Sequence, residues 1–205
     1  MNPFLPFILF AFVASITPGP TNILVLTNSS RHGVLAVMPI VLGACAGAAL
    51  IVLLVGMGLG DVLGRYRAVQ TVMLWIGIAW LTYLAWQIFN SPATAIEPQG
   101  PALSARKTGP RLGMLGGASL QLVNPKTWMM ALAVVSVFAG TDADRTARVI
   151  YLSLAFFLIS IPCMSVWAWL GASAAKFCTS ASSMQRFNQA MALLLLASTW
   201  LTLLV

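Results

Sequence analysis

The amino-acid sequence predicts an all-α integral membrane protein, and three observations carry this prediction. Of the 205 residues, 60% are hydrophobic and only 7% are charged, whereas about a quarter of the residues of a soluble domain carry charge. The apolar residues form blocks long enough to cross a bilayer core of about 30 Å. The basic residues behind the net charge of +7 lie mainly in short segments between these blocks. Such segments are typical of loops facing lipid headgroups, so we expect a membrane and no nucleic-acid partner.

We expect six transmembrane helices within a single transmembrane domain that spans residues 1–205. The first covers about 4–27 and is followed by a polar turn from Asn28 to Gly33. The second covers about 38–60 and, at 1.5 Å per residue, would be about 34 Å long, enough to cross a bilayer with some tilt. Asp61, Arg65 and Arg67 indicate a loop, after which the third helix covers about 68–89.

A hydrophilic stretch of about 91–112 contains four prolines and is expected to link two halves, about 1–90 and 113–205. In the second half we expect helices at about 113–139, 149–175 and 188–205, with connecting loops at 142–148 and 176–186. Each half then holds three helices. Because three is odd, a second half with the same fold must enter the membrane from the opposite side, which gives two inverted repeats.

The distribution of basic residues predicts the orientation of these helices. The loops on one side hold Arg31, Arg106, Lys107, Arg111, Lys176 and Arg186, and those on the other hold Arg65, Arg67, Arg145 and Arg148. Cytoplasmic loops carry the excess of Lys and Arg. Six against four therefore places both termini on the periplasmic side.

The first predicted helix contains the segment Thr17–Asn22, TPGPTN, near the middle of its apolar run. Its two prolines lack backbone N–H groups and disfavour a continuous helix. We therefore expect a break near mid-membrane. The backbone groups freed there cannot face lipid, so they must face protein or a wet cavity.

The fourth helix contains a second break, Gln121–Lys126, QLVNPK, at a similar depth in its own apolar run. A single proline is more simply interpreted as a kink, but matching breaks in the first helix of each half indicate a transport site. Half-helix N-termini can hold a carboxylate there, and exposed carbonyls can hold an ammonium group. Lys126 lies too far inside the helix to reach the membrane surface easily, which favours a functional role.

Small residues cluster in the second and fourth predicted helices, and an aromatic residue follows the second break. Glycines and alanines in the second and fourth helices allow close backbone approach; they are Gly43, Gly47 and Ala48, and Gly113, Gly116 and Gly117. Trp128, two places after Lys126, is a candidate for the wall of a cavity.

The chain resembles the lysine exporter family, also called the homoserine/threonine resistance family. The resemblance rests on Pro18-Gly19-Pro20, on Gly33 and Gly43, and on Asn124-Pro125-Lys126, in that order along a chain of this size. The Thr-Pro-Gly-Pro-x-Asn and Gln-x-x-Asn-x-Lys forms are most similar to the branch that exports cysteine and O-acetylserine. The resemblance implies amino-acid efflux driven by the proton-motive force across the bacterial cytoplasmic membrane. The expected substrate-binding residues are Thr17, Pro18, Gly19, Pro20, Asn22, Gln121, Asn124, Pro125 and Lys126.

The positions of the acidic residues constrain the substrate independently of the resemblance. Asp61, Glu97, Asp142 and Asp144 all fall in predicted loops, so a dicationic amino acid would lack a counter-charge within the membrane. Burying that unpaired charge costs several kcal/mol. A small neutral amino acid of the cysteine, O-acetylserine, threonine or homoserine type is favoured instead, with protons as the coupled ion and a homodimer left open.

Two alternative functions for a membrane protein of this size are a thiol-disulfide electron carrier and an inorganic-ion or metal exporter. The carrier requires two cysteines that meet, whereas Cys45 and Cys163 are expected in the second and fifth helices, away from both breaks. A metal exporter would require carboxylate, His or paired Cys ligands inside the membrane. No nucleophile and base are evidently paired, so we expect neither an enzyme nor a cofactor.

Overall fold

The computed structural model describes residues 4–90, 113–140, 143–177 and 180–201. The predicted linker at 91–112 lies outside the described residues. In the described ranges every regular element is a helix. These elements are α1 (Phe4–Ile16), α2 (Pro20–His32), α3 (Val34–Leu54), the π-helix η1 (Val55–Leu59), α4 (Gly60–Arg65), α5 (Arg67–Phe89), α6 (Met114–Leu122), α7 (Pro125–Phe138), α8 (Arg145–Phe177) and α9 (Ala181–Trp200).

Three of these stretches are long and apolar enough to cross a membrane: Val34–Val62, Ala68–Phe89 and Arg145–Ala174. A fourth is added if the bent pair α1 and α2 counts as one span. The all-helical membrane fold is confirmed, and the number six stays a prediction. The predicted fourth span is divided by the second break into α6, with only 9 residues, and α7, with 14, so neither is long enough alone. The predicted sixth span corresponds to α9, whose first turns carry the polar residues Gln185, Arg186 and Asn188.

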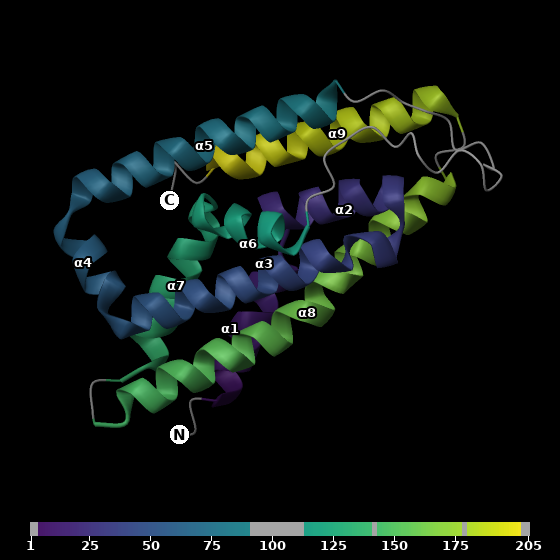
Figure 1. The fold of residues 1–205 in the computed structure, drawn as a ribbon. Coiled ribbons are helices and arrows are strands. Elements are labelled where there is room, and N and C mark those ends of the chain that lie inside the picture. Colours follow the sequence, from purple (N-terminus) through teal and green to yellow (C-terminus); the bar gives the residue numbers. More distant parts are fainter. Residues whose placement is uncertain (1–3, 91–112, 141–142, 178–179, 202–205) are drawn as a thin grey trace.

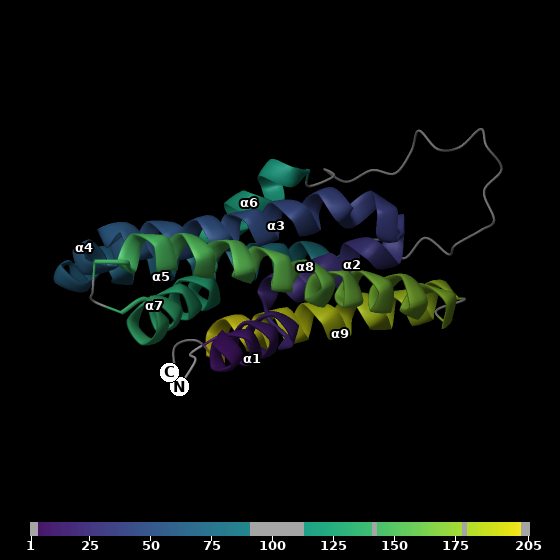
Figure 2. The ribbon, with the colours of Figure 1, turned by 90° about the horizontal axis from the view of Figure 1, so that it is seen from below.

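The helices form an elongated bundle (Figures 1 and 2). The long helices α3 and α8 pack against each other, and α5 and α9 form a second packed pair. The broken helices fill the space beside them, with α6 packed on α3 and α2 packed on α8. In Figure 1, α4 and the start of α8 lie at one end of the bundle, and the turn from α2 to α3 lies toward the other.

Glycines allow α3 and α6 to cross at close range. A Cβ atom on Gly43 would lie 1.9 Å from the carbonyl oxygen of Met114, and one on Gly117 would lie 2.3 Å from that of Ile40. A Cβ on Gly47 would lie 2.8 Å from the carbonyl oxygen of Ala118. No side chain fits at these separations, so the predicted packing role of these three glycines is confirmed. Gly113 has no atom within 4 Å of such a Cβ and takes no part in the crossing.

The prediction of a polar turn from Asn28 to Gly33 is wrong for residues 28–32, because α2 continues to His32. The hydroxyl and amide groups donate to backbone carbonyls of the preceding turn instead of ending the helix. Thr27 Oγ1 donates to Ile23 O at 2.8 Å, and Asn28 Nδ2 to Leu24 O at 2.9 Å. Only Gly33, with φ of 82°, leaves the helical conformation and turns the chain into α3.

Three predicted loops are shorter than expected. Residues 60–65 form α4, which follows a kink at Gly58, where φ is 116°. Helix α8 begins at Arg145, four residues before the predicted start. Helix α9 begins at Ala181 because Ser180 and Ser183 form a reciprocal capping box that the apolar pattern does not reveal.

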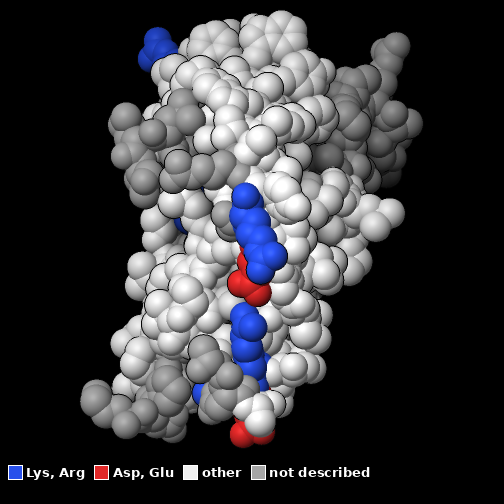
Figure 3. Space-filling model, turned by 90° about the vertical axis from the view of Figure 1, so that its left-hand side faces the viewer, with Lys and Arg blue, Asp and Glu red and all other residues white. Residues whose placement is uncertain are grey.

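Most of the charged side chains on the face shown in Figure 3 form a narrow line of basic and acidic groups, surrounded by uncharged residues. This view looks at the end of the bundle where α4 and the start of α8 lie. These elements carry Asp61 and Arg65, and Arg145 and Arg148. Charge gathered at the helix ends is expected of a bundle surrounded by lipid.

Candidate functional site

The first predicted break is present between Ile16 and Pro20, where α1 and α2 meet at a bend of 53°. Side chains from α2 and from α8 donate to the carbonyl groups freed there. Asn22 Nδ2 lies 3.0 Å from both Ser15 O and Thr17 O. Trp167 Nε1 of α8 lies 3.1 Å from Ile16 O. Non-helical backbone is thus held by protein groups, as a low-dielectric environment requires.

The second break separates α6 from α7 between Leu122 and Pro125. Asn124 caps α7, since its Oδ1 accepts from the backbone N–H of Lys126 at 3.2 Å, and Pro125 occupies the first helical position, where no N–H is required. Trp128 Nε1 donates to Leu122 O at 2.9 Å. Trp128 therefore stabilises the break itself and is not part of the cavity wall for which it was a candidate.

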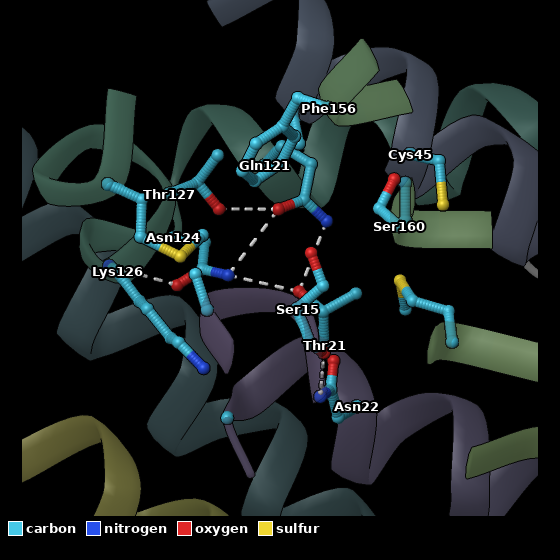
Figure 4. Close-up of a pocket in the computed structure, with 16 residues that line it drawn as sticks. Ser15, Thr21, Asn22, Cys45, Gln121, Asn124, Lys126, Thr127, Phe156 and Ser160 are labelled. Atoms are coloured by element: carbon cyan, nitrogen blue, oxygen red, sulfur yellow. Dashed lines mark hydrogen bonds between the residues drawn. The ribbon is translucent and has the colours of Figure 1, made fainter. Parts of the chain in front are cut away.

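Buried polar side chains join the two breaks (Figure 4). Thr21 Oγ1 accepts from Gln121 Nε2 at 3.1 Å and from Asn124 Nδ2 at 3.0 Å. Thr127 Oγ1 donates to Gln121 Oε1 at 2.6 Å. All four residues are buried. A network whose members pair with one another is rigid and holds the two half-helices in one relative position.

Lys126 reaches from the second break across to the first. Its Nζ donates to Thr17 O at 2.8 Å. A Cβ atom on Gly19 would lie 3.0 Å from Lys126 Cδ and 3.1 Å from Nζ. Glycine at position 19 therefore leaves room for the lysine side chain beside the backbone of the break.

A small cavity lies where the breaks meet. Its volume is about 40 Å³, counted as the space open to the centre of a water-sized sphere, which is room for a few waters. Of the predicted site residues, five line it: Gly19, Asn22, Gln121, Asn124 and Lys126. The other four, Thr17, Pro18, Pro20 and Pro125, shape the breaks without lining the cavity.

Sequence reasoning missed several lining residues. They share small or polar side chains on α1, α2, α3, α7 and α8, and include Ser15, Thr21, Cys45, Thr127 and Ser160. Thr21 and Thr127 sit inside or beside the two motifs, which was a usable signal. Ser15, Cys45 and Ser160 lie in ordinary apolar stretches, and only the packing of α1, α3 and α8 brings them together.

The expectation that both cysteines lie away from the breaks is wrong for Cys45, which lines the cavity. The prediction rested on the position of Cys45 in the second predicted helix. That helix, α3, packs directly beside α6, which leads into the second break, and this brings Cys45 to the cavity. Cys163 is buried outside the cavity lining, with its Sγ 4.0 Å from Phe12 O. Both are free thiols. In the described ranges no three His, Cys, Asp or Glu side chains group together as metal ligands.

Comparison with known proteins adds to this geometry. A model of the family described as LysE type translocator matches residues 12–201. The Cysteine/O-acetylserine efflux protein of Klebsiella pneumoniae subsp. pneumoniae is 29% identical over 167 residues, covering 80% of each chain. The protein of that name from Salmonella paratyphi A is 29% identical over 164 residues, covering 79% of this chain and 78% of its own. An uncharacterized membrane protein of Vibrio cholerae is 23% identical over 189 residues, covering 92% and 90%. No solved structure matches.

Proposed function

The chain belongs to the LysE type translocator family, and from this premise we propose that it is a secondary exporter of small neutral amino acids. Cysteine, O-acetylserine, threonine and homoserine are the type of substrate proposed. The names of the relatives from Klebsiella and Salmonella support the first two. The observation that carries the proposal is the meeting of two helix breaks at one cavity, with Lys126 between them.

The cavity offers complementary groups for the two charges of an amino acid. Lys126 is the only charged residue among those lining the cavity, and its ammonium group suits a substrate carboxylate. The carbonyl oxygen of Thr17, which accepts from Lys126 at 2.8 Å, would then be released to accept from the substrate ammonium group. No carboxylate lines the cavity to balance a second positive charge, so lysine and arginine are disfavoured.

The packing of the helices supports the proposal of six spans in two inverted repeats. If α1 corresponds to α6, α2 to α7, α3 to α8, and α5 to α9, the main contacts between the long elements have counterparts. The packing of α6 on α3 then corresponds to that of α1 on α8, and the packing of α2 on α8 to that of α7 on α3. The contact of α2 with α9 corresponds in the same way to that of α7 with α5. The self-paired contacts, α3 with α8 and α5 with α9, are also present. This exchange pattern is what a pseudo-two-fold axis produces.

We place the protein in the bacterial cytoplasmic membrane, with both termini periplasmic and with export coupled to protons by antiport. A cavity of about 40 Å³ is too small for a whole amino acid, so transport requires the half-helices to move apart. The breaks at Ile16 to Pro20 and Leu122 to Pro125 are the natural hinges for such a motion, because backbone hydrogen bonding is already interrupted there.

The proposal is tested with purified protein in liposomes that contain a panel of labelled amino acids. Efflux is followed with an imposed proton gradient and again after an uncoupler is added. Faster efflux of small neutral amino acids than of lysine or arginine, lost with the uncoupler, is the expected result. If the protein is folded and inserted but no amino acid leaves the liposomes, export is contradicted. If efflux occurs but the uncoupler does not affect it, only proton coupling is contradicted.

A further inference from the structure

We propose that the end of the cavity formed by Ser15, Cys45 and Ser160 is the subsite that receives the side chain of the transported amino acid, and that it selects short, uncharged side chains carrying a hydrogen-bonding group. This inference rests on the proposed function and adds to it the residues that determine specificity. In Figure 4, Cys45 and Ser160 lie on one side of the cavity and Lys126 on the other, with Ser15 between them.

Ser15 supplies the main evidence that this end binds a ligand. Its side chain is only 8% exposed, yet its Oγ has no hydrogen-bond partner. A buried hydroxyl without a partner is costly, and a helical serine usually avoids the cost by donating to a carbonyl of the preceding turn. Ser136 and Ser165 do so, with Oγ to carbonyl distances of 3.1 and 2.8 Å. Ser15 lines the cavity instead, which leaves its hydroxyl available to a bound molecule.

The central polar side chains are not available in the same way. Gln121, Asn124, Thr21 and Thr127 pair with one another, and Asn22 donates to Ser15 O and Thr17 O. These groups hold the breaks together. Hydrogen bonding to a substrate side chain at the far end of the cavity therefore falls to Ser15 and to its neighbours there.

Cys45 and Ser160 complete that end without adding charge. Cys45 from α3 and Ser160 from α8 are 1% and 3% exposed and lie side by side (Figure 4). Ser160 Oγ donates to Phe157 O at 2.9 Å and also pairs with the Cys45 thiol. Because a hydroxyl oxygen has two acceptor positions, one is still open to a bound molecule. Phe156 and Met164 form the apolar part of the wall. A thiol or hydroxyl side chain satisfies this mixture of groups, whereas a charged or wholly apolar side chain leaves either a charge or Ser15 without a partner.

The test compares amino acids that differ in the polar atom but not in size. Liposomes with purified protein are loaded with equal amounts of serine and 2-aminobutyrate, of cysteine and 2-aminobutyrate, and of homoserine and norvaline. The ratio of the two efflux rates is measured for wild type, Ser15→Ala and the control Ser136→Ala, which removes a hydroxyl from α7 outside the cavity lining. We expect wild type and Ser136→Ala to prefer the polar partner, and Ser15→Ala to reduce that preference about fivefold.

A second variant tests the subsite through its size. Cys45→Val adds bulk at the same end, and we expect it to reduce efflux of homoserine relative to serine, so it decides the matter if Ser15→Ala does not accumulate in the membrane. The inference is overturned if wild type exports amino acids but neither variant changes its selectivity. In that case the efflux ratios of Ser15→Ala, and the efflux of homoserine relative to serine in Cys45→Val, stay as in wild type. If folded wild type exports no amino acid at all, the proposed function fails first and the subsite with it.

Discussion

The ammonium nitrogen of Lys126 lies 2.8 Å from the carbonyl oxygen of Thr17, so a side chain at one helix break occupies a backbone acceptor at the other. The two residues are 109 positions apart in the sequence, and only the fold brings them together. A substrate that takes Lys126 away from Thr17 therefore changes a contact between the two halves of the protein. This is a direct way for binding to favour movement of the half-helices.

Enlarging Gly19 is predicted to disable the site without disturbing the rest of the fold. In Gly19→Val, the new side chain would occupy the space beside Lys126. Even its Cβ atom would lie only 3.0 Å from Lys126 Cδ. Losing the position of a charged hydrogen-bond donor should reduce efflux roughly tenfold or more. The matched control is Gly113→Val, because a Cβ there meets no atom within 4 Å. Equal efflux from both variants would show that Lys126 need not lie over Gly19.

Removing the hydroxyl of Thr21 is predicted to destabilise the contact between the breaks. Thr21→Val keeps the shape but leaves the Gln121 and Asn124 amides without their shared acceptor, at a cost of about 1–3 kcal/mol. Thermal unfolding in detergent should occur at lower temperature than in wild type, and Thr21→Ser should restore much of the loss. The control is Thr17→Val, because the exposed Thr17 hydroxyl donates to Val13 O in the last turn of α1 and does not join the two breaks. A Thr21→Val protein as stable as Thr17→Val would contradict the role given to this network.

The crossing of α3 and α6 predicts an effect of glycine substitution on folding rather than on transport. Gly43→Ala places a methyl group 1.9 Å from the Met114 carbonyl oxygen, so the two helices must separate. We expect less folded protein in the membrane and a lower unfolding temperature, with Gly113→Ala unchanged. A Gly43→Ala protein with wild-type yield and stability would mean that α3 and α6 do not cross as closely as described.

The orientation predicts where reporter proteins fused to the chain are active. With both termini periplasmic, a C-terminal reporter that folds only outside the cytoplasm should be active, and one that works only in the cytoplasm should be silent. Fusions within 91–112 should show the reverse. Activity of the cytoplasmic reporter at the C-terminus would reject the orientation and leave the helices themselves unaffected.

The sequence predicts the breaks well because proline acts locally. Pro18, Pro20 and Pro125 lack the N–H that a continuous helix needs, so both interruptions appear within a few residues of their predicted positions. Helix ends were predicted less well. Polar residues in α2 donate to their own backbone, and the capping box at Ser180 starts α9 early; neither effect changes the apolar pattern.

The far end of the cavity was not predictable, for a physical reason. Ser15, Cys45 and Ser160 come from α1, α3 and α8, and each looks like an ordinary small residue in an apolar helix. Which of a helix's small residues face a cavity depends on how the helices rotate and cross. That is set by contacts such as those of Gly43 and Gly117 with backbone carbonyls, which no single segment encodes.

The role of Lys126 is the central claim, and efflux from Lys126→Met and Lys126→Arg tests it most directly. Methionine keeps apolar bulk without charge or proton exchange, and arginine keeps charge but does not deprotonate near neutral pH. Efflux of a small neutral amino acid is measured at several pH values for each variant, at matched amounts of protein in the membrane. The control is Arg186→Met, which removes an exposed positive charge from α9 outside the cavity. We predict that Lys126→Met loses efflux while Arg186→Met retains it, and that Lys126→Arg loses the coupling to protons. Wild-type efflux and pH dependence in Lys126→Met would contradict the account.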